Sequence, residues 1–65
     1  MSTVEKSICE DLLKEGTVLN VDRFTCEGIN VECFSIEYLN ETYTMTRHDG
    51  EWVYFHHNIK AKGGN

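Results

Sequence analysis

Three pairs of turn-forming residues constrain the fold of this chain more than any other feature. Glu27-Gly28, Asn40-Glu41 and Asp49-Gly50 divide residues 17–57 into four segments that alternate between apolar and polar side chains. Asp-Gly is a strong signal for a two-residue hairpin turn, because both positions of a type I′ turn need a positive φ. Asn40-Glu41 is the weakest pair, since Glu does not favour that conformation, and a longer loop there would turn the following strand over. The spacing predicts an antiparallel meander.

A helix is expected before the first strand. Ser2 and Glu5 have the spacing of a capping box, so the helix should begin near Thr3. Gly16 is well placed to end it. Such a helix has about three turns and is too short to be stable alone, so it must pack against the sheet. Its apolar face would consist of Val4, Ile8, Cys9, Leu12 and Leu13.

Strands are predicted at roughly residues 17–26, 29–39, 42–48 and 51–57, adjacent in chain order. If all three turns are tight, one face of the sheet is strongly apolar and should be covered by the helix. Arg47 is the one charged residue in that face and would lie beside Trp52, in a cation–π contact. We therefore expect a single α+β domain over residues 1–59, with its N-terminal helix on one face of a four-stranded antiparallel meander, and a flexible tail at residues 60–65. The rows expected on the covered face are Leu19, Ile36, Met45 and Tyr54, then Val21, Phe34, Arg47 and Trp52, then Thr17, Tyr38, Tyr43 and His56.

The opposite face is predicted to be polar at its centre, with two apolar groups left over. A cluster of apolar side chains on the solvent face of a sheet often marks a contact surface. We expect the first group, at the tip of the first hairpin, to stay at least partly exposed and to bind a partner. The candidate partner-binding residues are Phe24, Cys26, Ile29 and Val31 in the first group, and Val53 and Phe55 on the last strand.

A polar row on the same face consists of Asp22, Cys33, His48 and Glu51. A Cys–His pair with a carboxylate has the chemistry of a nucleophile with its base, or of a set of metal ligands. The row lies on an open surface, however, and adjacent strands spread four side chains beyond the first shell of one metal ion. We therefore predict no catalytic residue, no metal site and no cofactor, and leave the role of the row open.

The net charge of −5 and the pI of about 5.0 argue against direct nucleic-acid binding, which needs a basic face. Three cysteines are an odd number and make no disulfide framework. No stretch approaches the length that spans a membrane, and no basic segment followed by an apolar run opens the chain. These features favour reduced thiols, a cytoplasmic location and no contact with a membrane.

The leading hypothesis is a small acidic, non-enzymatic protein-interaction module. It would bind a protein partner, or form a homodimer, through the outer sheet face or an edge strand. In size, acidity and its one helix with a meander, the chain also resembles small phage-encoded inhibitor proteins. The alternative hypothesis is an acidic inhibitor that mimics the charge of a nucleic acid and occupies a basic groove; it would weaken steeply as salt rises. Its acidic surface would consist of Glu5, Glu10, Asp11, Glu15, Glu27 and Glu32.

Overall fold

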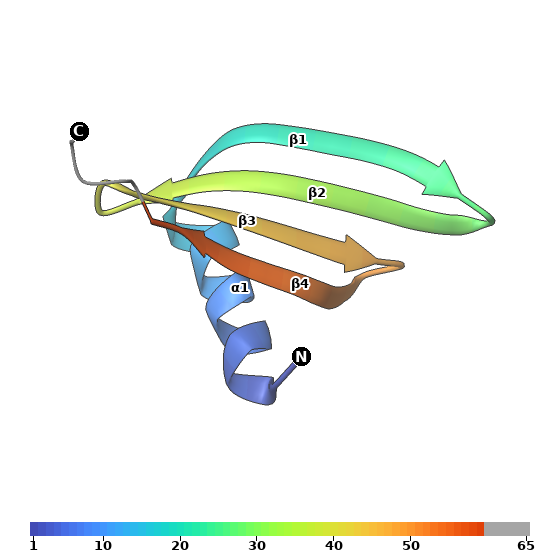
Figure 1. Ribbon diagram of the computed structural model, residues 1–65, viewed down its shortest axis with the longest axis horizontal. Helices are drawn as coiled ribbons and strands as arrows, with labels where there is room; N and C mark the ends of the chain where they lie inside the picture. Colours follow the sequence, from blue (N-terminus) through green and yellow to red (C-terminus); the bar gives the residue numbers. More distant parts are fainter. Residues whose placement is uncertain (60–65) are drawn as a thin grey trace.

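The computed structural model describes residues 1–59 and shows one N-terminal helix on one face of a four-stranded sheet (Figure 1). The four strands are antiparallel neighbours in the order β1-β2-β3-β4, so the predicted α+β architecture and meander are confirmed. The predicted tail at residues 60–65 lies outside the described residues. The elements are α1 (Thr3–Glu15), β1 (Thr17–Cys26), β2 (Ile29–Tyr38), β3 (Glu41–His48) and β4 (Glu51–Asn58).

The ends of α1 are set by the residues that the sequence suggested. The Glu5 backbone N–H donates to Ser2 Oγ at 3.1 Å, and the Ser2 backbone N–H donates to Glu5 Oε1 at 3.1 Å, which completes the capping box. At the other end, the Gly16 backbone N–H donates to the Leu12 carbonyl at 2.8 Å. Gly16 has an ordinary φ of −84°, but a Cβ atom there would lie 2.5 Å from Ile36 Cγ2. Glycine is therefore needed because the helix end approaches β2 so closely.

The hydrophobic core lies between α1 and the middle of the sheet. Phe34, Ile36 and Met45 are 3%, 0% and 0% exposed, as predicted. The helix covers them with Cys9 and Leu12, whereas Ile8, which was also expected to cover them, is 38% exposed and lies at the edge of the contact. The complete buried cluster is Cys9, Leu12, Phe34, Ile36, Met45 and Trp52.

The turn between β2 and β3 differs from the prediction. The two central residues of the turn are Leu39 and Asn40, with φ of 52° and 65°. The predicted central pair was Asn40-Glu41. Asn40, which tolerates positive φ, is a central residue in both arrangements, and Leu39 takes the other central position in place of Glu41. Phe34 consequently pairs with Met45, which was expected opposite Ile36. Moving the whole loop back by one residue shifts each partner by two positions, so every side chain keeps its predicted face.

Two irregularities in the edge strands change the predicted rows. The pairing of β1 with β2 shifts between Val18 and Asn20, which leaves Leu19 outside the regular ladder and 54% exposed. In β4 the pairing shifts between Trp52 and Tyr54, opposite Arg47 and Thr46. An extra residue in one strand reverses the faces of the residues beyond it, because the side-chain period of a strand is two.

Candidate protein-interaction surface

Among residues 1–59, no helix lies over the outer face of the sheet (Figure 1). At the tip of the β1–β2 hairpin this face carries Phe24, which is 51% exposed, and Ile29, which is 39% exposed. Cys26 pairs with Ile29 and is exposed beside it. These three residues, which we call the hairpin patch, have the exposure and the grouping expected of a contact surface.

Val31 was expected to be exposed with the hairpin patch, and this was wrong: it is only 7% exposed. Val31 lies on the second strand, between its cross-strand partners Phe24 and His48. Side chains opposite one another on adjacent strands share a face, so these two neighbours cover Val31 without any help from α1. Val31 therefore forms the floor of the hairpin patch, and its own side chain offers little surface to a partner.

The second apolar group of the outer face does not exist as predicted. Phe55 pairs with Met45, packs against the core and stacks on Tyr43 at 6.0 Å between ring centroids, so its placement on the outer face was wrong. Val53 is the extra residue of the β4 irregularity and is 44% exposed. Tyr54 takes the outward position opposite Thr46 and is 48% exposed. The sequence placed Tyr54 and His56 on the covered face, and this was wrong, because no turn residue or glycine signals the irregularity that turns them outward.

The predicted polar row is broken up by the same changes of register. Cys33 still pairs with Asp22 on one side, but on the other side it pairs with Thr46, whose hydroxyl donates to Cys33 Sγ at 3.6 Å. His48 lies opposite Val31, one row further towards the end of the sheet, and pairs with Glu51. Cys33 and His48 thus lie in different rows. Within residues 1–59 no three His, Cys, Asp or Glu side chains are grouped closely enough to hold a metal ion.

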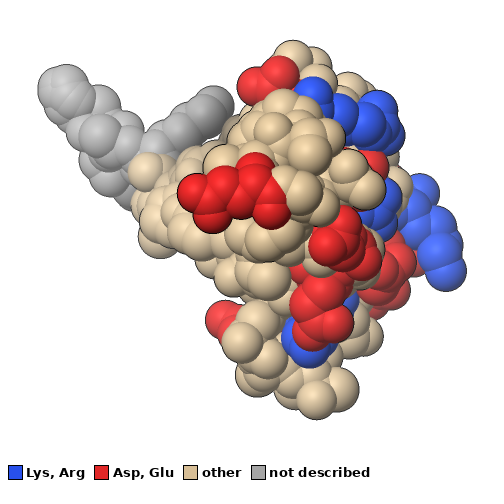
Figure 2. Space-filling model, turned by 90° about the vertical axis from the view of Figure 1, so that its right-hand side faces the viewer, with Lys and Arg blue, Asp and Glu red and all other residues tan. Residues whose placement is uncertain are grey.

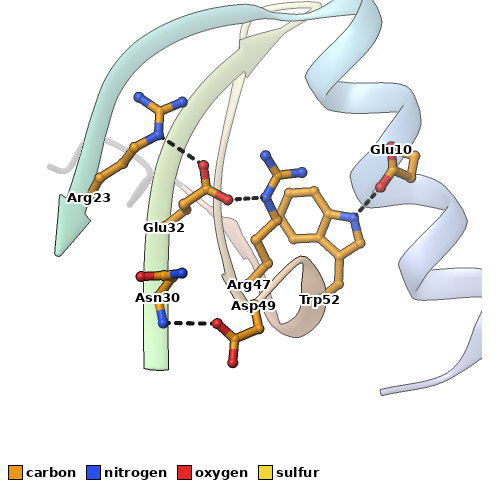
Figure 3. Close-up of polar contacts among 7 residues, drawn as sticks. All are labelled: Glu10, Arg23, Asn30, Glu32, Arg47, Asp49 and Trp52. Atoms are coloured by element: carbon orange, nitrogen blue, oxygen red, sulfur yellow. Dashed lines mark hydrogen bonds and ion pairs between the residues drawn. The ribbon is translucent and has the colours of Figure 1, made fainter. Parts of the chain in front are cut away.

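An ion cluster on the covered face lies beside Trp52, on the side away from α1 (Figure 3). Arg47 was predicted to be the one charged residue of this face, and this was wrong, because Glu32 and Arg23 lie in the same row. Glu32 accepts hydrogen bonds from Arg47 Nε and, at 2.9 Å, from Arg23 Nε. The Arg47 bond, followed by the Arg23 bond, lowers the pKa of Glu32 to about 2. Arg47 also lies over the rings of Phe34 and Trp52, 5.1 and 5.0 Å from their centroids, as the sequence suggested for Trp52. One carboxylate between two guanidinium groups leaves this cluster with a net positive charge.

The six carboxylates of the alternative acidic surface are scattered, and several have internal partners. Glu5 belongs to the capping box, and Glu10 accepts a hydrogen bond from Trp52 Nε1 at 2.6 Å (Figure 3). Glu32 lies between two arginines, and Glu27 occupies the first hairpin turn. Viewed towards the hairpin ends, acidic and basic side chains lie side by side and form no continuous acidic face (Figure 2). Asp11 and Glu15 are the two that share a common feature, a groove beside α1.

That groove, of about 260 Å³, runs between α1 and the covered face of β2 and β3. Its sides are formed by Ile8, Asp11, Leu12 and Glu15 from the helix and by Tyr38 and Tyr43 from the strands. The sequence placed Tyr38 and Tyr43 in one row of the covered face, but a groove between them and α1 depends on how the helix crosses the sheet.

Cys9 is the one fully buried thiol of the three free cysteines. Burial, with smaller contributions from the nearby carboxylates of Glu10 and Glu5, raises its pKa to about 11. A thiol with a raised pKa and no exposure is a packing residue without nucleophilic character.

Within residues 1–59, the single helix falls short of the length and apolarity needed to cross a membrane. Comparison with protein-family models, with curated proteins and with solved structures finds no match to this chain.

Proposed function

We propose that this chain is a non-enzymatic protein-interaction module that binds a partner protein through the hairpin patch. The observation that supports it is the coincidence of an uncovered sheet face with half-exposed Phe24 and Ile29 around the buried Val31. Large apolar side chains on paired strands offer a contact area whose burial is favourable, at about 25 cal/mol per Å².

The edge of β1 beside the patch supports the same site. Pairing of β1 with β2 is regular from Asn20 to Cys26, and nine of the ten residues in β1 are exposed. The free edge of this strand offers backbone N–H and C=O groups to a strand of the partner. Both edge strands contain an irregularity, but regular pairing in β4 runs only from Tyr54 to Asn58, a shorter stretch than Asn20 to Cys26 in β1, and so offers less edge to an added strand.

Charge favours a different protein over a second copy. The chain carries a net charge of −5, and Asp22 and Glu27 lie on the hairpin that carries the patch. Two copies joined through this surface would bring like charges together, which costs free energy. A partner with an apolar centre and basic surroundings has no such conflict. Three free cysteines support the further proposal of a reducing, cytoplasmic compartment.

The acidic inhibitor remains the second candidate and has weaker support. A mimic of nucleic-acid charge needs a row of carboxylates free to meet a basic groove. Glu32 is neutralised by Arg23 and Arg47, and Glu10 is bound to Trp52. The main support for the inhibitor is the net charge of the whole chain, −5.

The test uses the chain and two variants as bait in a lysate of the native host, at about 0.1 M and about 1 M salt, where the screening length falls from about 10 Å to about 3 Å. The captured protein is then purified and its binding measured by calorimetry. Phe24→Ser combined with Ile29→Thr should abolish binding, whereas Leu39→Asn should not, because it removes an exposed apolar side chain at the opposite end of the sheet. Circular dichroism confirms that each variant is folded.

Binding that survives high salt and is lost in the double variant supports the hairpin patch. Binding that disappears at high salt and is unchanged in the folded double variant overturns the proposal and supports the acidic inhibitor instead.

A further inference from the structure

The groove beside α1 lies on the face of the sheet opposite the hairpin patch, so it is an independent feature of the molecule. Its floor is aromatic: Tyr38 and Tyr43 come from adjacent strands and are partly buried. The Tyr43 ring stacks on His57, at 4.7 Å between ring centroids, and on Phe55, at 6.0 Å. These two contacts restrict the orientation of the Tyr43 ring.

The wall of the groove that α1 forms combines apolar side chains with two exposed carboxylates. Leu12 is buried and Ile8 is 38% exposed, and both line the groove. Asp11 and Glu15 stand one helical turn apart on the same wall and are exposed. Neither carboxylate forms an ion pair or a side-chain hydrogen bond within residues 1–59.

Within residues 1–59, no lysine or arginine side chain is among the residues that line the groove. Glu41 is the cross-strand partner of Tyr38, and its carboxylate binds His57 Nε2 at 2.6 Å. The nearest lysine on the helix, Lys14, is not among the residues that line the groove. An aromatic floor, an apolar wall and two unpaired carboxylates together match a cation carried on an apolar stem, because a tyrosine ring attracts a cation over its face.

We propose that this groove binds the side chain of a lysine or arginine from a partner protein. The methylene stem lies along Leu12 and Ile8, and the charged group lies between a tyrosine ring and the carboxylates of Asp11 and Glu15. The proposal goes beyond the hairpin patch, since it assigns a second contact on the opposite face of the sheet and a basic character to the segment bound there.

The probe is a capped peptide, Ala-Leu-Lys-Leu-Ala, titrated into the ¹⁵N-labelled full chain and followed by NMR. Resonances of Tyr38, Tyr43 and Leu12 should shift, with weaker shifts for the peptide in which Gln replaces Lys. A third peptide with Arg in the same place shows which of the two cations fits better. The Lys peptide is added to about 2 mM, a concentration above the dissociation constant expected when a single side chain is bound. Absence of any shift at these residues under that condition overturns the proposal.

The carboxylates are tested by Asp11→Asn combined with Glu15→Gln. This variant should weaken binding of the Lys peptide by about three- to tenfold, as expected for two exposed charge contacts. The matched control is Asp22→Asn combined with Glu27→Gln, which removes the same charge from the β1–β2 hairpin and should leave the affinity unchanged. An equal loss in both variants would mean that the overall charge, and not this groove, attracts the peptide.

The aromatic floor is tested by a conservative pair. Tyr43→Phe keeps the ring and should keep the affinity, whereas Tyr43→Leu should lose it. Equal affinity in the two variants contradicts a cation–π contact. Phe24→Ser combined with Ile29→Thr should leave peptide binding unchanged, so failure of this proposal and failure of the hairpin patch are distinguishable.

Two other occupants would overturn the assignment to a partner. Shifts of groove resonances on dilution without peptide would assign the groove to a second copy. Shifts produced by replacing Lys60 and Lys62 with Ala, again without peptide, would assign it to the chain's own basic end.

Discussion

Successive residues of β2 meet opposite environments on the two faces of the sheet. Phe34 and Ile36 face α1 and are 3% and 0% exposed, whereas Cys33 and Ser35 alternate with them, on the face that no helix of the described chain covers. Burial of apolar surface is the dominant favourable contribution to folding, and here it is concentrated on the covered face. Stability should therefore depend mainly on one set of alternate residues. The other set has more freedom to serve binding.

The exposure of a side chain depends on its strand as well as on its face of the sheet. Val31 belongs to the open face and is nevertheless 7% exposed, since it lies on an inner strand between two covered neighbours. Phe24 belongs to the same face but lies on the edge strand β1 and is 51% exposed. The edge strand therefore exposes Phe24, and the inner strand supports it with the buried Val31 and exposes an apolar side chain only at its first residue, Ile29.

The sharpest contrast between the faces should come from Ile36→Ala and Ser35→Ala. Loss of the fully buried Ile36 side chain leaves a cavity and should cost about 2–5 kcal/mol, enough to unfold a domain of this size. Ser35→Ala, on the open face, should stay within about 1 kcal/mol of the unchanged chain. Urea denaturation of each variant provides the free energy of unfolding. Similar losses at both positions would mean that the covered face does not dominate stability.

The contact between α1 and the covered face is tested at Gly16. A Cβ there would lie 2.5 Å from Ile36 Cγ2 and 2.8 Å from the Leu12 carbonyl oxygen, so Gly16→Ala should destabilise the fold by about 1–3 kcal/mol. Gly28→Ala is the comparison, because its Cβ would meet nothing within 4 Å and the cost, about 1–2 kcal/mol, comes from its φ of +81°. Thermal unfolding measures both. No loss at Gly16 would show that the helix end can move away from β2.

Val31→Ala measures how much the buried side chain on the open face contributes to the free energy of unfolding. Removing two methyl groups from this 7% exposed side chain should cost about 1–2 kcal/mol. Val53→Ala, at a 44% exposed position of β4, should cost less than about 0.5 kcal/mol. Chemical denaturation distinguishes the two values. Equal costs would show that Val31 is open to solvent and available to a partner.

The smallest effect should come from the ion cluster of Arg23, Glu32 and Arg47. The folded chain lowers the pKa of Glu32 from the usual 4.5 to about 2, chiefly through the Arg47 hydrogen bond. Ionised Glu32 thus adds stability above pH 4.5 that is lost as the pH falls towards 2. The difference in free energy of unfolding between the unchanged chain and Glu32→Gln should narrow over that range.

Glu27→Gln is the control for this pH dependence, since Glu27 forms no ion pair within residues 1–59. A difference for Glu32→Gln that stays constant between pH 5 and pH 2, the range set by the two pKa values, would contradict a contribution from the charge of Glu32.

Local signals in the sequence were sufficient for the order and type of all five elements. The Ser2–Glu5 capping box, Gly16, Glu27-Gly28 and Asp49-Gly50 each lie where the structure uses them. The same signals identified the partly exposed Phe24 and Ile29 of the candidate site. They could not identify the groove beside α1, because its walls come from the helix and from two strands that the sequence does not orient relative to one another.

The sequence by itself determined which side of the inner strands is covered, because alternation with a period of two survives the displacement of a turn by one residue. Only the tertiary structure decided where the irregularities around Leu19 and Val53 lie. Such irregularities accompany the twist of the sheet, and no glycine or turn residue in the sequence predicts these two. One extra residue in β4 was enough to turn Phe55 into the core and Tyr54 out to the open face. Local chemistry selects the elements, whereas the packing of α1 across a twisted sheet selects the register of its edges.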